Sequence, residues 1–274
     1  MPAPIRHAMC NEAFGETPFA ESCRVLRSAG YAGIEIAPFT LAPDPLGITP
    51  ERRRELRAIM QGEGIAFVGL HWLMVSPAGL HVTTPDDALR ARSWRHIRDL
   101  IGLCADLGEK GVMIFGSPKQ RSTTGGLTRE QATRHYVEGL REVAGQAADR
   151  GVTVLVEALP KSQSDVVRTL AEAAAIVFEI GSPAVQTMFD VHNAEDETVP
   201  HTELLEKYFD IIRHVHVNEM DGRYPGTGDY DFGSLLRRLC ELNYEGWVSL
   251  EVFDFKPDAA SIARASIEYL KNHE

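Results

Sequence analysis

Several features that would restrict the fold or the compartment are missing from this chain of 274 residues. Its four cysteines, Cys10, Cys23, Cys104 and Cys240, form no CxxC pair and no disulfide framework, which is typical of a reducing compartment. No apolar run approaches the roughly 20 residues that a membrane helix needs. The segment from Met1 to Cys10 is too polar and too proline-rich for a secretory signal. We therefore expect a cytoplasmic protein with no membrane segment.

The sequence also lacks an excess of positive charge. Lysine and arginine together number 28, aspartate and glutamate 39, and the formal net charge is −11. Surfaces that bind nucleic acid are basic because they neutralise phosphates, so this balance speaks against a nucleic-acid partner. It leaves open a small neutral substrate or a substrate that binds together with a metal ion.

No low-complexity segment and no linker interrupts the chain, and short β-like runs alternate with longer helical runs. The β-like runs are rich in Val, Ile and Phe, as expected for parallel strands covered on both faces. The expected strand and helix pairs are, in order, 5–9 with 19–29, 33–37 with 50–63, 65–70 with 85–107, 111–115 with 128–150, 153–157 with 164–180, 185–190 with 201–209, 212–217 with 232–242, and 246–251 with 257–272.

This alternation predicts an α/β protein, a single (β/α)8 TIM barrel over residues 1–274. An open doubly wound sheet is the alternative. No GxGxxG motif follows the first strand, so dinucleotide binding, the commonest use of that alternative, loses support.

The predicted helix ends carry local signals. Thr49 before Pro50, and Thr128 before Arg129, are typical starts, because a threonine side chain caps the first free amide groups. Glycines follow helical runs where a left-handed residue commonly ends a helix. These glycines are Gly30, Gly108, Gly151 and Gly181.

Polar residues lie at the ends of four successive predicted strands. Glu157, Asp190 and Glu251 end the fifth, sixth and eighth strands, and His216 lies near the end of the seventh. In a parallel barrel these strand ends meet at one rim. His214 points to the same face as His216 because side chains in a strand alternate. It lies deeper, so we expect it to pack below the rim or to support the ligand.

Three carboxylates in one crevice repel one another unless a cation lies between them. One carboxylate at a strand end is explained equally well as a helix cap, but four successive strands are hard to explain in that way. Carboxylates with one imidazole favour Mn²⁺, Mg²⁺ or Co²⁺ over structural zinc. We predict one divalent ion held by Glu157, Asp190, His216 and Glu251, with Mn²⁺ expected and Mg²⁺, Co²⁺ or Zn²⁺ as alternatives.

The segments VLVEALP, MFDVHNA, HVHVNE and VSLEVF, which carry these four residues, resemble the xylose isomerase-like barrels of the sugar phosphate isomerase and epimerase family. The steps between the four residues are 33, 26 and 35, and they are similar to those of ketose 3-epimerases of the D-tagatose or D-psicose type. The resemblance implies a metal-dependent isomerase or epimerase that acts on a keto sugar or related polyol. It also implies a homo-oligomer, a dimer or a tetramer.

The resemblance further implies a mechanism. The metal holds two neighbouring oxygens of the sugar and polarises its carbonyl. Glu157 or Glu251 removes a proton to give a metal-bound enediolate, and the other returns a proton to the opposite face. Return of the proton to the neighbouring carbon gives aldose–ketose isomerisation, and the sequence does not choose between the two outcomes.

Three positions depart from the epimerase pattern. Asn193, with His192 before it, stands where the resemblance implies a substrate-binding histidine, and Gln163 stands where it implies a glutamate. Arg223 lies seven residues after His216 rather than six. We therefore expect a substrate other than a free ketohexose. The expected substrate-binding residues are His71, Gln163, His192, Asn193, Glu219 and Arg223.

Other polar residues near strand ends have two interpretations each. His71, at the end of the third strand, could contact a sugar or could be a packed histidine. Glu35, in the second strand, is either a rim residue or a buried polar partner. Lys119 is expected in a solvated loop, and Asn11 and Glu12 are weaker candidates.

Three competing functions remain. A dehydratase or lyase acting on a keto-inositol or a 3-keto-glycoside would use the same carboxylates. An endonuclease IV-type nuclease needs an extra histidine after the fourth strand, where the chain reads Phe115-Gly116-Ser117, and the net charge opposes DNA. A non-catalytic sugar-binding barrel is the third.

Overall fold

The computed structural model describes residues 4–274, so residues 1–3 of the predicted domain lie outside it. Within that range eight strands form a closed barrel in the order of the sequence, and every neighbouring pair is parallel. This confirms the predicted TIM barrel and excludes the open sheet. The strands are β1 (Arg6–Cys10), β2 (Gly33–Ile36), β3 (Ala66–Leu70), β4 (Val112–Phe115), β5 (Thr153–Val156), β6 (Val185–Asp190), β7 (Ile212–Val217) and β8 (Trp247–Leu250).

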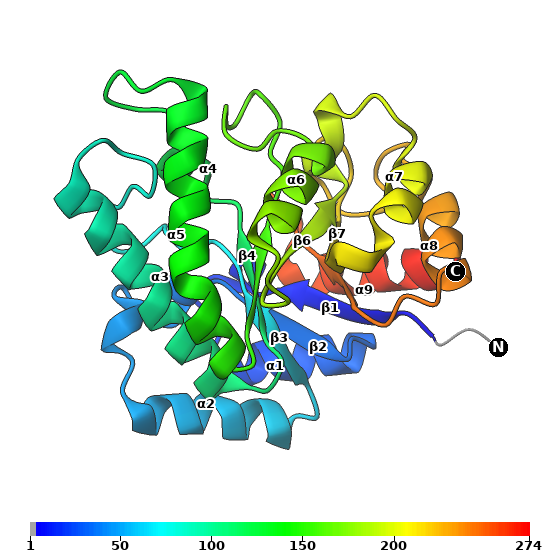
Figure 1. Cartoon of the computed structure of the whole chain (residues 1–274). Helices are drawn as coiled ribbons and strands as arrows, with labels where there is room; N and C mark the ends of the chain where they lie inside the picture. Colours follow the sequence, from blue (N-terminus) through cyan, green and yellow to red (C-terminus); the bar gives the residue numbers. More distant parts are fainter. Residues whose placement is uncertain (1–3) are drawn as a thin grey trace.

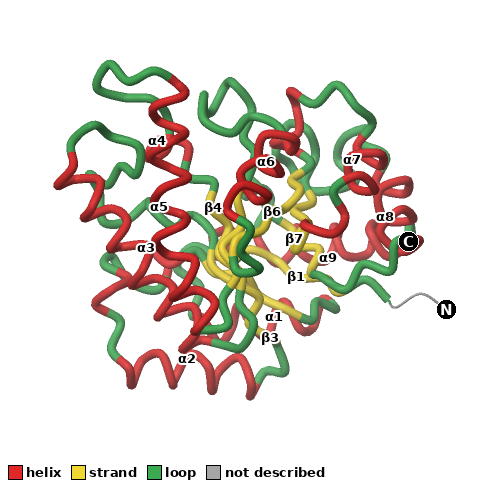
Figure 2. Tube along the Cα trace, viewed as in Figure 1, coloured by secondary structure: helices red, strands yellow, loops and turns green. Residues whose placement is uncertain are grey.

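Helices surround the barrel, and the strands lie in the middle of the molecule (Figures 1 and 2). The helices that connect successive strands are α1 (Phe19–Ala29), α2 (Pro50–Gly62), α3 (Asp87–Leu107), α5 (Arg129–Asp149), α6 (Leu170–Ile180), α7 (His201–Lys207) and α8 (Phe232–Glu241), and α9 (Ala259–Lys271) follows the last strand. A short helix, α4 (Pro118–Arg121), follows β4 directly. No helix of residues 4–274 is both long enough and apolar enough to cross a membrane.

Strand alternation gives the barrel an apolar floor and a polar upper end. In β7, Val215 and Val217 belong to the core beneath the helices, so His214 and His216 face the barrel interior. The floor of the interior is a separate apolar cluster of Ala8, Val68, Val112, Ile114, Leu155 and Met188, with Trp247 packed against it. Polar side chains therefore gather at the end where the strands terminate.

The predicted N-terminal caps are confirmed. The Thr49 hydroxyl accepts a hydrogen bond from the Arg52 amide at the start of α2. Thr128 forms a reciprocal capping box with Gln131 at the start of α5. Each cap satisfies an amide that the first helical turn leaves free.

Three of the four predicted C-terminal glycines are left-handed, and the fourth prediction is wrong. Gly30, Gly151 and Gly181 have φ of 109°, 65° and 65°. Gly108 has φ of −176°, which is extended backbone. A Cβ at Gly108 would lie 2.8 Å from the ring of Phe67, so close packing, and not a left-handed turn, requires glycine there.

The helix predicted from residue 164 begins later, at Leu170. Thr169 caps α6 by accepting a hydrogen bond from the Glu172 amide. The preceding residues form a loop, because the Asp165 carboxylate binds the backbone and side chain of Thr123 after β4. This contact between the loops after β4 and β5 is not visible in helical periodicity.

Candidate active site

The four residues predicted as metal ligands lie together at the rim of the barrel. Glu157, Asp190, His216 and Glu251 each offer one ligand atom, and these atoms all lie within 4.8 Å of one another. Asp190 and His216 are paired directly in the ladder between β6 and β7. The Nδ1 atom of His216 lies 3.0 Å from Glu251 Oε2 and 3.3 Å from Asp190 Oδ2. All four residues are buried.

The chemistry of this group fits a cation. Asp190 Oδ2 and His216 Nδ1 are buried and have no hydrogen-bond partner among the described residues. Burial, followed by the charges of Asp190 and Glu251, raises the pKa of Glu157 to about 8. Burial also raises the pKa of Glu251. A divalent ion would offset this repulsion and would bind the free oxygen and nitrogen.

Glu35 lies below the rim and supports the histidines from β7. It is fully buried, its Oε1 lies 2.9 Å from His216 Nε2, and its Oε2 lies 2.8 Å from His214 Nε2. Burial tends to raise the pKa of Glu35, but the two imidazoles outweigh it and hold this pKa well below its usual range. A His216 ring that donates from Nε2 keeps the lone pair of Nδ1 facing the carboxylates, as in carboxylate–histidine–metal sites.

The same contacts explain the protonation preference of His216. Burial alone would lower its pKa, but the nearby charges of Glu35 and Glu251 hold it well above the usual value. A metal ion must therefore displace a proton from this ring, because the ligand form of histidine is neutral.

Two predicted substrate-binding residues lie beside Glu157. The Asn193 side chain donates from Nδ2 to Glu157 Oε1 at 2.9 Å, and its backbone amide donates to Asp190 Oδ1 at 2.9 Å. Gln163 donates from Nε2 to Asn193 Oδ1 at 3.0 Å. The hydrogen bonds from Gln163 to Asn193 and from Asn193 to Glu157 fix one oxygen of Glu157.

A small cavity opens above the carboxylates. The rings of Trp72 and Phe253 meet edge to face at 6.3 Å, and both line this cavity. Its lining also includes His71, Ser117, Glu157, Gln163, Asn193 and Glu251. The predicted candidate His71 therefore lies in the pocket, and the combination of an aromatic wall with convergent polar groups is typical of small-molecule sites.

Arg223 and Glu219, both predicted to bind substrate, have other contacts. Arg223 is exposed, and its Nε donates to Asp221 Oδ2 at 2.7 Å, so it does not enter the pocket. Glu219 is buried, and its carboxylate accepts hydrogen bonds from the amides of Gly226 at 2.9 Å and Tyr230 at 3.3 Å. Glu219 therefore organises the loop after β7, and this contact could not be predicted from its position at a strand end.

His192 lies near the mouth but not in the lining of the cavity. Its Nδ1 lies 2.8 Å from the carbonyl oxygen of Met220, and its ring packs on Phe253 with centroids 4.9 Å apart. It therefore packs against Phe253, which lines the cavity. Lys119 is exposed on α4, as expected for a solvated residue.

Arg121 is a structural residue at this rim that sequence reasoning missed. It is fully buried, and its Nη1 donates to the backbone carbonyls of Phe115 and Glu157, both at 2.8 Å. It thus joins the ends of β4 and β5. A charged KQR segment gives no sign of this burial, because arginine is usually exposed.

A larger groove of about 1270 Å³ lies on the outside, between α5 and α6. Four of its charged side chains are paired with one another, Arg129 with Glu172 and Arg141 with Glu179. None of the four residues Glu157, Asp190, His216 and Glu251 lines this groove, so the smaller cavity at the rim is the candidate active site.

The closed parallel barrel, with a polar cavity at its carboxyl rim, defines a TIM barrel of the enzyme type. The chain belongs to the xylose isomerase-like TIM barrel family, whose pattern matches residues 23–273. This confirms the family predicted from the sequence.

Curated relatives are named as sugar epimerases. The 3-dehydro-D-guloside 4-epimerase of Escherichia coli (strain K12) is 24% identical over 271 residues, which cover 95% of this chain and 97% of the relative. An L-ribulose 3-epimerase of Mesorhizobium japonicum is 26% identical over 83% of this chain and 73% of the relative. The comparison confirms the predicted class, enzymes of the sugar isomerase and epimerase type.

Solved structures show the same fold. A 3-keto-D-glucoside 4-epimerase from E. coli matches with a TM-score of 0.85 and 22% identity, covering 98% of this chain and 100% of that one. A D-psicose 3-epimerase from Clostridium cellulolyticum H10, with D-tagatose, matches with a TM-score of 0.84 and 18% identity, covering 98% and 99%.

Proposed function

We propose that this protein is a divalent-metal-dependent epimerase or isomerase of a keto sugar, and that Glu157 and Glu251 are its acid and base. The observation that carries the proposal is the buried group of Glu157, Asp190, His216 and Glu251, whose ligand atoms lie within 4.8 Å of one another beneath a cavity. The names of the relatives support the reaction class.

The four residues of this group would hold the ion. When bound, a divalent cation supplies Lewis acidity, which makes the carbon next to the sugar carbonyl more acidic. We expect Mn²⁺ because three carboxylates and one imidazole suit a hard or borderline ion, and Mg²⁺ and Co²⁺ are alternatives.

Proton transfer falls to the two glutamates. Glu157 and Glu251 follow β5 and β8, which are not neighbours in the barrel, and both line the cavity. One glutamate removes a proton from the carbon next to the carbonyl, and the other delivers a proton to the opposite face of that carbon. The hydrogen bond from Asn193 Nδ2 to Glu157 Oε1 helps to fix the orientation of this carboxylate, which lines the cavity. Buried carboxyls with raised pKa values are suited to both roles.

The cavity also indicates how the substrate is oriented. Trp72 and Phe253 offer apolar ring surface, and His71, Gln163 and Asn193 offer hydrogen-bonding groups that suit sugar hydroxyls. A 3-keto-glycoside is the first substrate to test, because the relative that spans nearly the whole chain is named for one. Ketohexoses and ketopentoses are the second set.

The proposal is tested by isotope exchange. Protein loaded with Mn²⁺ is incubated in D₂O with a 3-keto-glucoside, D-fructose or L-ribulose, and NMR detects deuterium at the carbon next to the carbonyl. We expect exchange and a new epimer or isomer with at least one of these sugars. Glu157→Gln and Glu251→Gln should each lower the rate by about 10²–10⁴-fold, because each removes one acid–base group.

The control is Glu195→Gln, which neutralises an exposed carboxylate close to the metal group in sequence and should leave exchange unchanged. Near-normal formation of the epimer in Glu157→Gln or Glu251→Gln would contradict the two-carboxylate scheme. Loss of water from the sugar would instead indicate a dehydratase that uses the same enediolate.

A further inference from the structure

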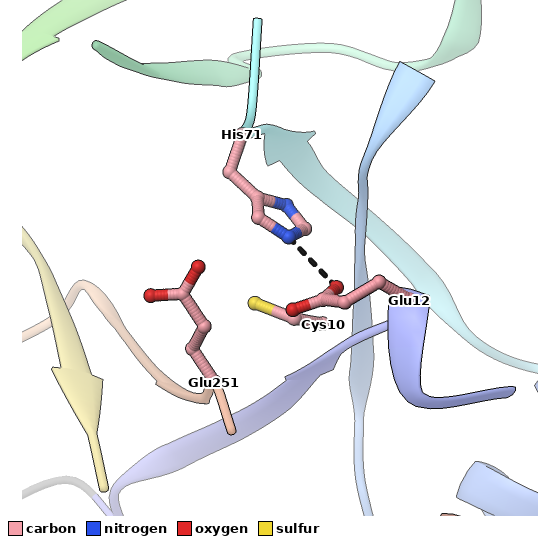
Figure 3. A group of neighbouring side chains, drawn as sticks. All are labelled: Cys10, Glu12, His71 and Glu251. Atoms are coloured by element: carbon pink, nitrogen blue, oxygen red, sulfur yellow. Dashed lines mark hydrogen bonds and ion pairs between the residues drawn. The ribbon is translucent and has the colours of Figure 1, made fainter. Parts of the chain in front are cut away.

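A second group of potential ligands lies beside the proposed metal site. Cys10 ends β1, Glu12 follows it, His71 follows β3, and Glu251 follows β8. One ligand atom of each lies within 4.8 Å of the other three. Figure 3 shows that these side chains come from the ends of three strands, with Cys10 and Glu12 from the same one, and converge on a common centre. The proposed function gives no role to Cys10 or Glu12.

The group contains one short contact and one unpartnered carboxylate oxygen. His71 Nε2 lies 2.8 Å from Glu12 Oε2. The other oxygen, Glu12 Oε1, is buried and has no hydrogen-bond partner within residues 4–274. In Figure 3 this free oxygen points toward the sulfur of Cys10. The Glu12 side chain is only 8% exposed, so water does not readily replace the missing partner.

The histidine and the thiol are held in place from below. His71 Nδ1 lies 3.3 Å from Glu35 Oε1 without a hydrogen bond, and Nε2 faces Glu12. Cys10 Sγ has a long contact, 3.7 Å, with the hydroxyl of Ser249. Burial and the charge of Glu35 raise the pKa of Cys10 to about 12, so without a cation it is a neutral thiol. Metal coordination deprotonates a thiol.

We propose that Cys10, Glu12, His71 and Glu251 form a second cation site that takes Zn²⁺ or Co²⁺. One sulfur, one nitrogen and two oxygens make a four-ligand set that suits these borderline ions, and thiolate ligands disfavour Mg²⁺. Ideal bond lengths place neighbouring ligand atoms roughly 3.5 Å apart, so small side-chain shifts close the observed group around an ion.

Glu251 belongs to both sites, and the second site rests on the proposed first site only through this residue. Its Oε2 faces His216 Nδ1 at 3.0 Å, which leaves Oε1 for the second ion. A carboxylate that bridges two cations is a recurring feature of two-metal sites. Asp190 belongs to the first site alone, and Cys10 and Glu12 belong to the second and not to the first, so the two sites can be separated by mutation at these residues. A ligand atom of His216 also lies within 4.8 Å of one of Cys10, so the two sites adjoin there as well as at Glu251.

The test is a Co²⁺ titration of the metal-free full chain, with metal content measured after equilibrium dialysis and thiolate-to-cobalt charge transfer followed in the near ultraviolet. We expect two ions per chain and a charge-transfer band. Cys10→Ala should remove the band and one ion. Cys23→Ala is the matched control, because Cys23 is equally buried but lies in α1, and it should keep both.

Other variants and a folding check separate this proposal from the proposed function. Asp190→Asn should remove the first ion and keep the band, and Glu12→Gln should weaken the band while far-ultraviolet circular dichroism stays unchanged. One ion per chain without a band would overturn the second site while leaving the first intact. Two ions retained by folded Cys10→Ala would overturn it as well.

Discussion

One buried carboxylate, Glu35, controls the orientation of several groups at the rim. It contacts His214, His216 and His71, at 2.8 Å, 2.9 Å and 3.3 Å. Because all these atoms are shielded from water, the loss of the Glu35 charge cannot be replaced by solvent. The positioning of the proposed ligand His216 therefore depends on a residue that does not itself belong to the Glu157 group.

Glu35→Gln is predicted to weaken Mn²⁺ binding. The amide has one accepting oxygen in place of two and carries no charge, so the support of His216 weakens and the ring loses part of its basicity. Loss of such a supporting partner typically costs 10–100-fold in metal affinity, and we expect about this effect in a calorimetric titration. Glu172→Gln, in an ion pair on the outer surface, serves as the control. Equal affinity in Glu35→Gln and wild type would refute the positioning role.

The raised pKa of Glu157 predicts how the stability of the metal-free protein depends on pH. The group titrates at about 8 in the folded chain, above its ordinary value of 4.5. Between these values the native state keeps a proton that the unfolded chain has lost, so this group makes the free energy of unfolding decrease as pH rises. Urea unfolding at pH values of about 5.5 and about 8 should detect the decrease.

Glu157→Gln provides the control for this pH effect, because an amide does not titrate and leaves only the contributions of other groups. The difference in unfolding free energy between the two pH values should therefore be smaller in the variant. Mn²⁺ should also reduce it in the wild type, since the ion replaces the proton. An identical pH dependence in variant and wild type would argue against a raised pKa.

The four rim residues could be predicted from the sequence, whereas several of their neighbours could not. Glu157, Asp190, His216 and Glu251 lie at strand ends, and parallel topology alone brings such positions together. Arg223 lies outside the cavity, in a loop whose shape depends on hydrogen bonds to Glu219. Periodicity contains no information on such loop contacts.

At the scale of the helices, two glycines in α5 offer a direct test of packing. A Cβ at Gly139 would lie 1.8 Å from the ring of Trp94, so α5 approaches α3 closely there. Gly145, in the same helix, has no heavy atom of the described residues within 4 Å of a Cβ, apart from its own helix. The same substitution therefore has opposite consequences at the two positions.

Gly145→Ala is predicted to raise the unfolding free energy by about 1 kcal/mol, because alanine favours a helix over glycine by this amount. Gly139→Ala should lower it by about 1–3 kcal/mol, the usual cost of overpacking a core. Chemical denaturation of both variants measures the two effects. A stabilised Gly139→Ala would show that α3 and α5 are not in close contact.

Helix and strand identities were predictable, but several boundaries were not. Caps such as Thr49 and Thr128 act within one turn, so the sequence reveals them directly. The late start of α6 depends on Asp165 binding Thr123 in another loop, and the extended Gly108 depends on the ring of Phe67. Both are tertiary contacts, which local patterns do not contain.

At the scale of the whole molecule, the apolar residues that stabilise the barrel interior and the polar residues of the candidate site lie in different parts of the barrel. The interior of its lower part is filled by an apolar cluster that includes Val68, Leu155 and Met188. The buried charged residues of the Glu157 group lie at the carboxyl rim, where loops can vary without disturbing that floor. In the metal-free protein the rim carboxylates repel one another, and a bound ion would offset this repulsion.

The central claim, that Glu157, Asp190, His216 and Glu251 hold a divalent ion, is tested most directly by anomalous X-ray diffraction from a crystal soaked in Mn²⁺. We predict a manganese peak with all four side chains at bonding distances of roughly 2.1 Å, and its loss in Asp190→Asn. A map of the fully soaked wild-type crystal that shows the four side chains in place and no manganese between them would contradict the claim.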